Sequence, residues 1–388
     1  MAEFATKRTL AVLIAAGSIL LGSAGDAGAR APGEVLSAAP LKPGLWIPKT
    51  TRAAFRLKYV TTNARGKRAV STGMLFLPKG KPPSGGWPVI SWAHGTSGLG
   101  DACAPSLIGP ALPRRDRPYL ANWMREGYAI VASDYAGLGT PGLMAYLHGR
   151  SEAHNIVDIV KAGRAYARRL SATSRLARKW VVIGQSQGAG AAIYTARYAT
   201  KFGGRGLDYR GAVGTGTPAY IENVVTQLAP GFPELSPGLT AYMAYILAGL
   251  RWTHPDLGID GALTSYGRKY VKLAETRCVF AFENDLEDAL VGNFFASRLI
   301  NLPSFATTVR DYMGMPEQGF DRPFFMGHGL EDVDVPFTLT EPYVDKLKAN
   351  HEPLTFKTYA ADHSGTLLES QKDTHPFVRK LFARGAAD

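Results

Sequence analysis

The 388-residue sequence predicts an α/β fold, with a mostly parallel sheet and helices on both faces. Two observations predict it. Apolar strand-like runs alternate with helical stretches between residues 87 and 217, and the same alternation returns from residue 323. The roughly 100 residues between these regions lack the alternation. We therefore expect one large α/β domain with a mostly helical insertion.

The first 29 residues predict a secretory signal peptide. Lys7 and Arg8 precede an apolar core at residues 10–21, and the small residues that follow end in Ala-Gly-Ala at 27–29, which resembles a cleavage site. A membrane anchor is the alternative, but the uncharged run at residues 9–25 is shorter than the roughly 20 residues that a spanning helix needs. We expect an exported protein, periplasmic or extracellular.

The composition is typical of a globular protein, with 46% hydrophobic and 20% charged residues. The net charge of +12 comes from basic residues spread along the chain, without a nucleic-acid-binding module. We interpret it as a solvated basic face and expect no nucleic-acid partner. The sequence holds no HExxH motif, zinc-type cysteine pairs, EF-hand loop or phosphate-binding loop, so no metal site or cofactor is expected.

The N-terminal half predicts a series of strands and helices. Residues 53–61 and 68–76 alternate around a turn and indicate an antiparallel hairpin at the edge of the sheet. A buried strand at residues 87–92 follows. After it come a helix at 117–126 and a strand at 128–133. A long helix then starts with Ser151 as N-cap and Glu152 in its first turn, and runs to about residue 170.

A sharp strand-turn-helix unit lies at residues 180–196. The apolar run before Gly184 suits a buried strand, and the small residues after Gly188 suit a tightly packed helix. Between them, Gly-x-Ser-x-Gly places Ser186 on a turn whose flanking residues must have almost no side chain. This order of elements is typical of the nucleophile elbow of α/β-hydrolases. A surface turn with a solvated serine is the alternative.

The insertion occupies residues 220–320. Its apolar helical pieces, such as 239–250 and 270–275, are broken by prolines. We interpret this segment as a cap over the site, inserted into a core formed by residues 30–219 and 321–388. A separate C-terminal domain is the alternative, but strands are predicted again at 323–327 and 354–359, with a helix at 341–348 between them.

Three residues form a candidate catalytic triad. Ser186, Asp332 and His363 each follow a predicted strand, in the chain order nucleophile, acid, histidine expected on this fold. Asp334 and Glu331 are alternatives for the acid.

Backbone donors for an oxyanion are predicted at two places. One is the N–H of Gln187, and the other belongs to Gly95 or Thr96, in the loop after the strand at 87–92. His94 is interpreted as structural because it precedes the nucleophile, and His328 as ordering its own turn.

Two cysteines, Cys103 and Cys278, make up the thiol content of the chain. An even number of cysteines in an exported protein suggests one disulfide, and two unrelated buried thiols are the alternative.

Several motifs together resemble the secretory lipase family of α/β-hydrolases, over about residues 40–385. They are His94-Gly-Thr-Ser-Gly, Cys103-Ala-Pro-Ser, Asp134-Tyr-Ala-Gly-Leu-Gly, Gly184-Gln-Ser-Gln-Gly and the long insertion before Asp332. The resemblance implies a secreted hydrolase of carboxylic esters, including acylglycerols, with a helical cap. By match to the motifs it implies the triad Ser186, Asp332 and His363. It also implies a disulfide from Cys103 to Cys278 in the cap.

The expected function is that of a serine carboxylester hydrolase, a lipase or esterase, that acts on small-molecule or lipid esters through an acyl-enzyme. A serine peptidase or amidase, and an inactive binding protein of the same fold, are the alternatives. Six apolar residues of the insertion are expected either to bind the acyl chain or rest transiently on a lipid interface, or else to pack in the core: Leu239, Tyr242, Met243, Tyr245, Ile246 and Leu250.

Overall fold

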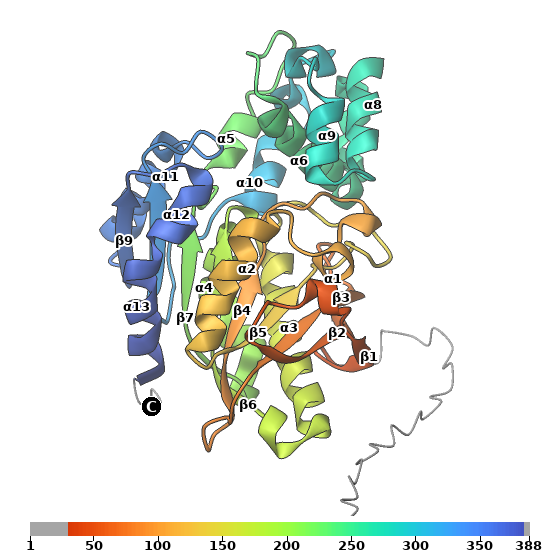
Figure 1. The fold of residues 1–388 in the computed structure, drawn as a ribbon. Coiled ribbons are helices and arrows are strands. Elements are labelled where there is room, and N and C mark those ends of the chain that lie inside the picture. Colours follow the sequence, from red (N-terminus) through yellow and green to blue (C-terminus); the bar gives the residue numbers. More distant parts are fainter. Residues whose placement is uncertain (1–29, 384–388) are drawn as a thin grey trace, which may run out of the picture.

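The computed structural model describes residues 30–383, so the predicted signal peptide lies outside the described residues. A nine-stranded sheet crosses the molecule in the order β1-β2-β3-β5-β4-β6-β7-β8-β9 (Figure 1). The pairs β1–β2, β2–β3 and β3–β5 are antiparallel, and all later pairs are parallel. The predicted α/β architecture is confirmed. The strands are β1 (Val35–Pro40), β2 (Thr51–Thr62), β3 (Arg68–Pro78), β4 (Trp87–Ala93), β5 (Ala129–Ser133), β6 (Leu176–Gln185), β7 (Asp208–Thr215), β8 (Phe324–Gly329) and β9 (Leu354–Tyr359).

Helices cover both faces of the sheet because its central strands are apolar on both sides. Along β6, Trp180 and Val182 belong to one buried cluster, whereas Val181 and Ile183 belong to the other. The first cluster lies under α3 (Gly149–Leu170), α4 (Gln187–Gly203) and α11 (Phe337–Ala349). The second lies under α2 (Pro113–Arg125), α12 (His363–Glu369) and α13 (Gln371–Ala383).

Two details of the N-terminal half differ from the predictions. The hairpin β2–β3 forms, but β1 pairs outside β2 and is the edge strand. Its side chains are not buried, so its sequence shows no apolar alternation that could reveal a strand. Ser151 is not the N-cap of α3. His148 takes that position, and its Nδ1 accepts a hydrogen bond from the backbone N–H of Ser151.

The segment between β7 and β8 is helical and lies beyond one end of the sheet, where α6, α8 and α9 stand together (Figure 1). Its helices are α5 (Ile221–Val225), α6 (Pro237–Thr253), α7 (Ile259–Ala262), α8 (Ser265–Ala274), α9 (Val279–Asp285) and α10 (Phe305–Met313), with short 3-10 turns between them. Among residues 30–383, no helix has the length and apolar character needed to cross a bilayer.

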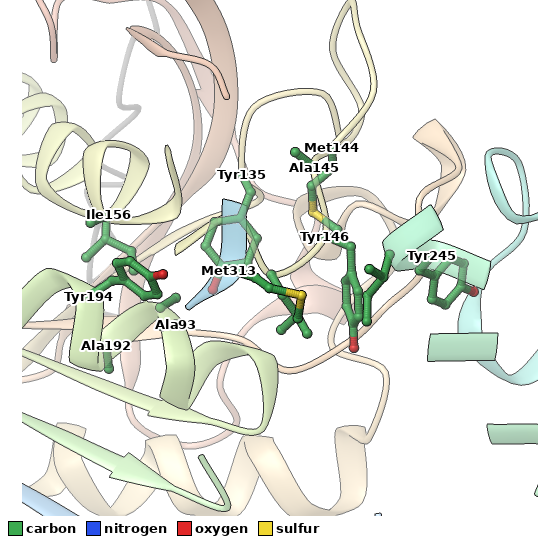
Figure 2. Packing of buried hydrophobic residues seen from close by; sticks show 14 of the residues in the cluster. Ala93, Tyr135, Met144, Ala145, Tyr146, Ile156, Ala192, Tyr194, Tyr245 and Met313 are labelled. Atoms are coloured by element: carbon green, nitrogen blue, oxygen red, sulfur yellow. The ribbon is translucent and has the colours of Figure 1, made fainter. Parts of the chain in front are cut away.

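This helical segment shares a continuous hydrophobic core with the sheet. Tyr146, in the loop before α3, packs its ring 5.6 Å from the ring of Tyr245 on α6 (Figure 2). The hydroxyl of Tyr312 on α10 donates to the carbonyl of Tyr146 at 2.9 Å. Both contacts are buried. Burial of these aromatic rings fixes the segment against the sheet layer.

A disulfide joins the loop after β4 to the helical segment. Cys103 is bonded to Cys278, the residue before α9. Backbone pairing surrounds the bond: Gly98 and Cys278 form an isolated β-bridge, and the N–H of Val279 donates to the carbonyl of Ser97 at 3.0 Å. Both the covalent bond and the hydrogen bonds hold α9 beside β4.

Replacing both cysteines by serine is expected to lower the free energy of unfolding. The bond closes a loop between residues separated by 175 positions, which in the chain-entropy model corresponds to a stabilisation of up to about 5 kcal/mol. Denaturant unfolding of the Cys103→Ser/Cys278→Ser variant measures the loss, and wild-type protein unfolded in reductant is the control. Equal unfolding midpoints for oxidised wild type and variant would contradict this role.

Candidate active site

Ser186 sits in a strained turn between β6 and α4. Its φ is +59°, a left-handed value that a residue with a side chain adopts only when its surroundings impose it. A Cβ on Gly184 would lie 1.9 Å from the carbonyl oxygen of Gly188. A Cβ on Gly188 would lie 1.9 Å from that of Ala93. Neither position has room for a side chain, which is the steric demand that the sequence motif predicted.

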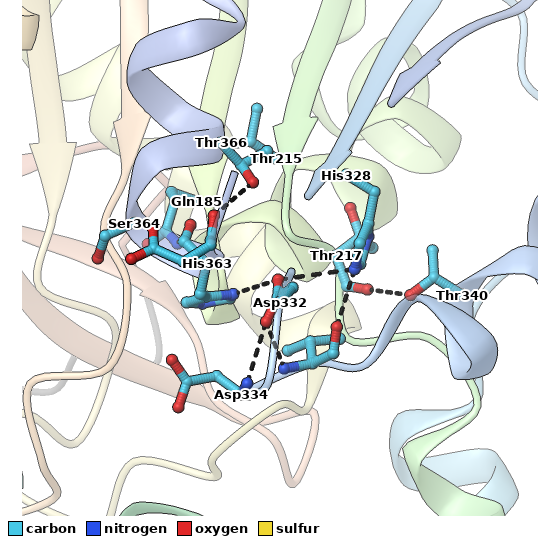
Figure 3. Close-up of polar contacts among 12 residues, drawn as sticks. Gln185, Thr215, Thr217, His328, Asp332, Asp334, Thr340, His363, Ser364 and Thr366 are labelled. Atoms are coloured by element: carbon cyan, nitrogen blue, oxygen red, sulfur yellow. Dashed lines mark hydrogen bonds and ion pairs between the residues drawn. The ribbon is translucent and has the colours of Figure 1, made fainter. Parts of the chain in front are cut away.

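His363 and Asp332 form a short hydrogen bond. The Nδ1 of His363, at the start of α12, lies 2.6 Å from Oδ2 of Asp332, in the loop after β8 (Figure 3). The other carboxylate oxygen, Oδ1, accepts from the backbone N–H groups of Asp334 (3.0 Å) and Val335 (2.8 Å). Of the three candidate acids, the structure therefore places Asp332 against the histidine. Glu331 is exposed, and Asp334 faces cavities beside Ser186.

His328 holds the loop that carries Asp332. Its Nε2 lies 2.8 Å from the carbonyl oxygen of Val335, which can only accept, so Nε2 carries the proton. Burial lowers the pKa of His328 and keeps the ring neutral. The histidine thus orders its own turn, as the sequence predicted, and through it the acid.

The second ring nitrogen of His363, Nε2, is available to act as a general base. Because Nδ1–H donates to Asp332, Nε2 carries a lone pair, and it is buried without a hydrogen-bond partner in the part of the chain that is described. Ser186 and His363 line the same cavity. The side chain of Gln185 donates to the carbonyl of His363 at 3.3 Å and so holds its backbone.

Gly216, the residue after β7, was missed by sequence reasoning. Its φ is +60°, and a Cβ there would lie 2.8 Å from Cε1 of His363. A side chain would displace the imidazole. No motif surrounds this glycine, so only the fold reveals that β7 ends beside His363.

The predicted oxyanion residues gather around Ser186. A Cβ on Gly95 would lie 3.6 Å from the Cβ of Ser186. Gln187 is the first residue of α4, so its N–H has no partner within the helix. The hydroxyl of Thr96 lies 2.6 Å from that of Tyr146, which fixes the loop.

Ser186 lies at the boundary of two cavities. The first cavity, of about 290 Å³, contains His94, Thr96 and His363 in its walls, together with apolar side chains such as Leu112 and Phe280. The second cavity is apolar, with a volume of about 210 Å³, and is lined mainly by side chains of α5, α6, α11 and the loops before α6 and α11: Ile221, Val224, Leu235, Leu239, Tyr242, Met243, Ile246, Val335, Pro336 and Leu339. A third cavity, of about 660 Å³, lies between α5, α10 and α11 and does not contact Ser186.

The six apolar residues named in the insertion divide into two groups by position. Leu239, Tyr242, Met243 and Ile246 line the apolar cavity. Tyr245 and Leu250 are fully buried in the core. None of the six is exposed at the surface.

Glu152 is a buried acid behind the candidate nucleophile. Its Oε1 accepts a hydrogen bond from Nε2 of Gln187 at 2.7 Å. Burial raises the pKa of Glu152 to about 8. Four buried tyrosines surround it, and burial raises their pKa values too, so they stay neutral: Tyr135, Tyr146, Tyr194 and Tyr312. The sequence placed Glu152 in the first turn of α3 but gave no sign that it faces inward.

Asp332, Asp334 and His363 each offer an atom within 4.8 Å of the others, a spacing that could hold a metal ion. However, the Asp332 carboxylate already accepts hydrogen bonds on both oxygens, one of them from the histidine. A metal would have to displace these bonds. These three side chains are therefore better suited to orienting His363 than to binding a metal ion.

The comparisons with known proteins agree with the fold and the motifs. A model of the secretory lipase family matches residues 114–293, which confirms the predicted resemblance. Among solved structures, Candida antarctica lipase A aligns over 93% of this chain and 84% of its own, with a TM-score of 0.74 and 22% identity. The rice cell wall degrading esterase LipA from Xanthomonas oryzae aligns over 90% of this chain and 98% of its own (TM-score 0.72, 18% identity). The protein therefore has the α/β-hydrolase fold.

A probable trichothecene esterase of Stachybotrys chartarum is 27% identical over 175 residues, or 42% of this chain. The alignment spans 35% of the length of that relative.

Replacing Glu152 by glutamine is expected to stabilise the protein in a pH-dependent manner. Between about pH 4.5, where the unfolded carboxyl titrates, and about 8, the folded wild type keeps a proton that the unfolded chain has lost. Wild-type stability therefore falls by about 1.4 kcal/mol per pH unit relative to the neutral glutamine. Urea unfolding at pH 5, 6.5 and 8 measures the difference between variant and wild type.

The exposed Glu341→Gln variant is the matched control and should show no such trend. A constant difference between Glu152→Gln and wild type across the three pH values would mean that Glu152 is ionised in the folded protein.

Proposed function

We propose that this protein is a serine carboxylester hydrolase, a lipase or esterase that works through an acyl-enzyme. The observation that carries the proposal is the 2.6 Å hydrogen bond from Nδ1 of His363 to Asp332, with His363 and the strained Ser186 lining one cavity. The secretory lipase match and the lipase and esterase neighbours support the same chemistry.

In the proposed acylation step, Oγ of Ser186 attacks the ester carbonyl carbon and its proton passes to Nε2 of His363. Asp332 stabilises the imidazolium. The negative charge on the carbonyl oxygen is held by the backbone N–H of Gln187 and that of Gly95 or Thr96. Collapse of the tetrahedral intermediate breaks the bond to the alcohol oxygen, which takes the proton from His363.

Deacylation repeats these steps with water as the nucleophile in place of Ser186. His363 takes a proton from the water as its oxygen attacks the acyl carbon. Collapse then breaks the bond to Ser186, and the proton returns from His363 to the serine oxygen. The products are an alcohol and a carboxylic acid, and the enzyme is regenerated.

The helical segment at residues 220–320 would act as the cap over a core made of residues 30–219 and 321–388. Its helices α5 and α6 supply six of the residues that line the apolar cavity, which also contacts Ser186 and suits an aliphatic acyl chain. An apolar wall offers little to a peptide backbone, which favours esters of fatty acids over peptides. The disulfide and the predicted signal peptide support export from the cytoplasm.

Substitution of the triad is expected to abolish ester hydrolysis. Ser186→Ala should lower kcat for p-nitrophenyl octanoate by about 10⁶-fold, and Asp332→Asn by about 10⁴-fold, because the histidine loses its orienting partner. Steady-state kinetics on p-nitrophenyl esters and peptide anilides measures both. The exposed Ser297→Ala is the control. Unchanged ester turnover in Ser186→Ala would refute the nucleophile, and cleavage of anilides alone would favour a peptidase.

Filling the apolar cavity is expected to shorten the preferred acyl chain. Leu239→Trp adds volume where the chain would lie, so kcat/KM for p-nitrophenyl laurate should fall about tenfold or more. The value for the acetate should change less than about twofold. Leu290→Trp, at an exposed position, is the control. An equal loss for both esters would show that the acyl chain binds elsewhere.

A further inference from the structure

Acidic residues are absent from two long stretches of the sequence. Residues 35–100 and 159–207 contain ten Lys or Arg residues each and no Asp or Glu. The rest of the chain holds more acidic than basic residues, so the net charge of +12 arises from these two acid-free stretches. Such a distribution produces a strong local field if the two stretches meet in the fold.

The two acid-free stretches do meet, at the edge of the sheet where β6 begins. Arg175 directly precedes β6, and its carbonyl oxygen accepts a hydrogen bond at 2.9 Å from the N–H of Trp87, the first residue of β4. Arg52, at the start of β2, donates from Nη2 to the carbonyl oxygen of Thr173 at 3.1 Å. Arginines from both stretches are therefore neighbours in space.

Three further arginines belong to the same edge of the sheet. Arg164, near the C-terminal end of α3, donates from Nε to the carbonyl of Ala177 and from Nη1 to that of Gly206, both at 2.9 Å. The guanidinium of Arg178 donates to the carbonyl of Arg205. Carbonyl groups carry no net charge, so these hydrogen bonds hold the arginines in place without neutralising them.

Together with Arg168 they form a group that we call the basic edge: Arg52, Arg164, Arg168, Arg175, Arg178 and Arg205. Five of the six are exposed, and Arg164 is half-buried. None forms an ion pair with a carboxylate among residues 30–383. Burial, together with the charges of Arg168, Arg178 and Arg175, lowers the pKa of Arg164 to about 10, so these guanidinium groups repel one another.

The basic edge and Ser186 lie at opposite ends of the sheet. Strands β4 and β6 to β9 are parallel, and Ser186, Asp332 and His363 follow the ends of β6, β8 and β9. The basic edge instead surrounds the start of β6, a strand of 10 residues, which span about 30 Å. This end of the molecule points away from α6, α8 and α9 (Figure 1). A partner bound there leaves Ser186 uncovered.

The side chains of the two acid-free stretches favour a hydrated polyanion over a lipid bilayer. Proteins that bind a bilayer surface combine basic residues with apolar ones that enter it. Among the described residues of these stretches, Leu170 is the only large apolar side chain that is exposed. All six cations of the basic edge are arginines, and the planar guanidinium group binds the paired oxygens of an acid in a bidentate manner.

We propose that the basic edge binds an acidic polysaccharide, through the acid groups repeated along the polymer. A flexible, hydrated chain contacts several arginines at once and removes their mutual repulsion. It holds the protein by the end remote from Ser186, so the candidate active site remains accessible to substrate. This inference goes beyond the proposed hydrolase function and does not depend on it.

Binding is measured by fluorescence anisotropy with fluorescein-labelled alginate, a polysaccharide that carries carboxylates. Labelled dextran is the uncharged control polymer and should not bind. Wild type should bind alginate with a Kd of about 10⁻⁴ to 10⁻⁶ M at physiological salt, the range of sequence-independent binding to a polyanion. A fourfold rise in NaCl concentration should weaken binding by about tenfold or more, because binding releases counterions.

The variant Arg168→Gln/Arg175→Gln/Arg178→Gln removes three charges from the basic edge and should raise the Kd for alginate by about tenfold or more. Its kcat/KM for p-nitrophenyl octanoate should stay within about twofold of wild type, because the substitutions lie at the far end of β6. Arg168→Gln/Arg175→Gln keeps the hydrogen bond of Arg178 and serves if the triple variant fails to fold.

The matched control is Lys269→Gln/Arg298→Gln/Lys357→Gln, which removes three exposed charges from the helical segment and β9. Both triple variants have the same net charge, so the comparison separates the basic edge from the overall charge of the protein. The control should bind alginate with a Kd within about threefold of wild type, because charges farther away than the Debye length are screened.

Several results would overturn the proposal. Equal loss of affinity in the two triple variants would show attraction by net charge alone, and wild type that fails to bind alginate would remove the partner. Tighter binding to phosphatidylglycerol vesicles or to double-stranded DNA than to alginate would replace the polysaccharide by another polyanion. Competitive inhibition of ester hydrolysis by alginate would place the polymer at Ser186 instead.

The binding measurement is independent of catalysis. Ser186→Ala should bind alginate with the wild-type Kd, since the basic edge is unchanged. Alginate binding in a protein that hydrolyses no ester would therefore reject the proposed function and retain this inference.

Discussion

The close approach of α4 to the ends of β4 and β6 is the constraint on which the site depends. The carbonyl oxygens of Ala93 and Gly188 lie where side chains at residues 188 and 184 would stand, so the chain can turn here only with glycine at both positions. This contact forces Ser186 into its left-handed conformation, which costs on the order of 1–3 kcal/mol. The buried strands on either side supply the packing that maintains this strain.

The same contact sets the positions of residues that do not belong to the motif. Because α4 starts directly after Ser186, the side chain of Gln187 enters the core and meets Glu152 of α3. A buried acid with a raised pKa lowers the stability of the folded protein, and an apolar residue of similar size would stabilise it more. Its hydrogen bond instead fixes Gln187, whose backbone N–H is the proposed oxyanion donor. The arrangement suggests that stability is lost here in exchange for a fixed first turn of α4.

The sequence predicted those parts of the structure that local residue patterns specify. The apolar runs at β4 and β6 and the Gly-x-Ser-x-Gly turn are local, and they predicted both the sheet and the position of Ser186. The acid was expected at Asp332 from its place after a predicted strand, with Glu331 and Asp334 as alternatives, and the contact with His363 supports Asp332. Residues whose environment depends on distant contacts could not be recognised. Gly216 and Glu152 carry no motif, and β1 has no buried face to give it an alternating pattern.

The surroundings of His94 also depend on distant contacts, and its interpretation as structural stays a prediction. Its position after β4 is local, but the cavity it faces is formed by α2, α9 and α12, which are far away in the sequence. What brings α9 there is the disulfide at Cys278 and the backbone pairing of Ser97 and Gly98 with Val279 and Cys278. Opening the helical segment along this edge would break those bonds, so the wall made by α9 is fixed relative to the proposed oxyanion loop. The apolar cavity is lined partly by α5 and α6 instead, which no disulfide joins to the sheet layer. The wall made by α9 is thus attached to the loop after β4 by a covalent bond as well as by backbone hydrogen bonds, whereas packing holds the walls made by α5 and α6.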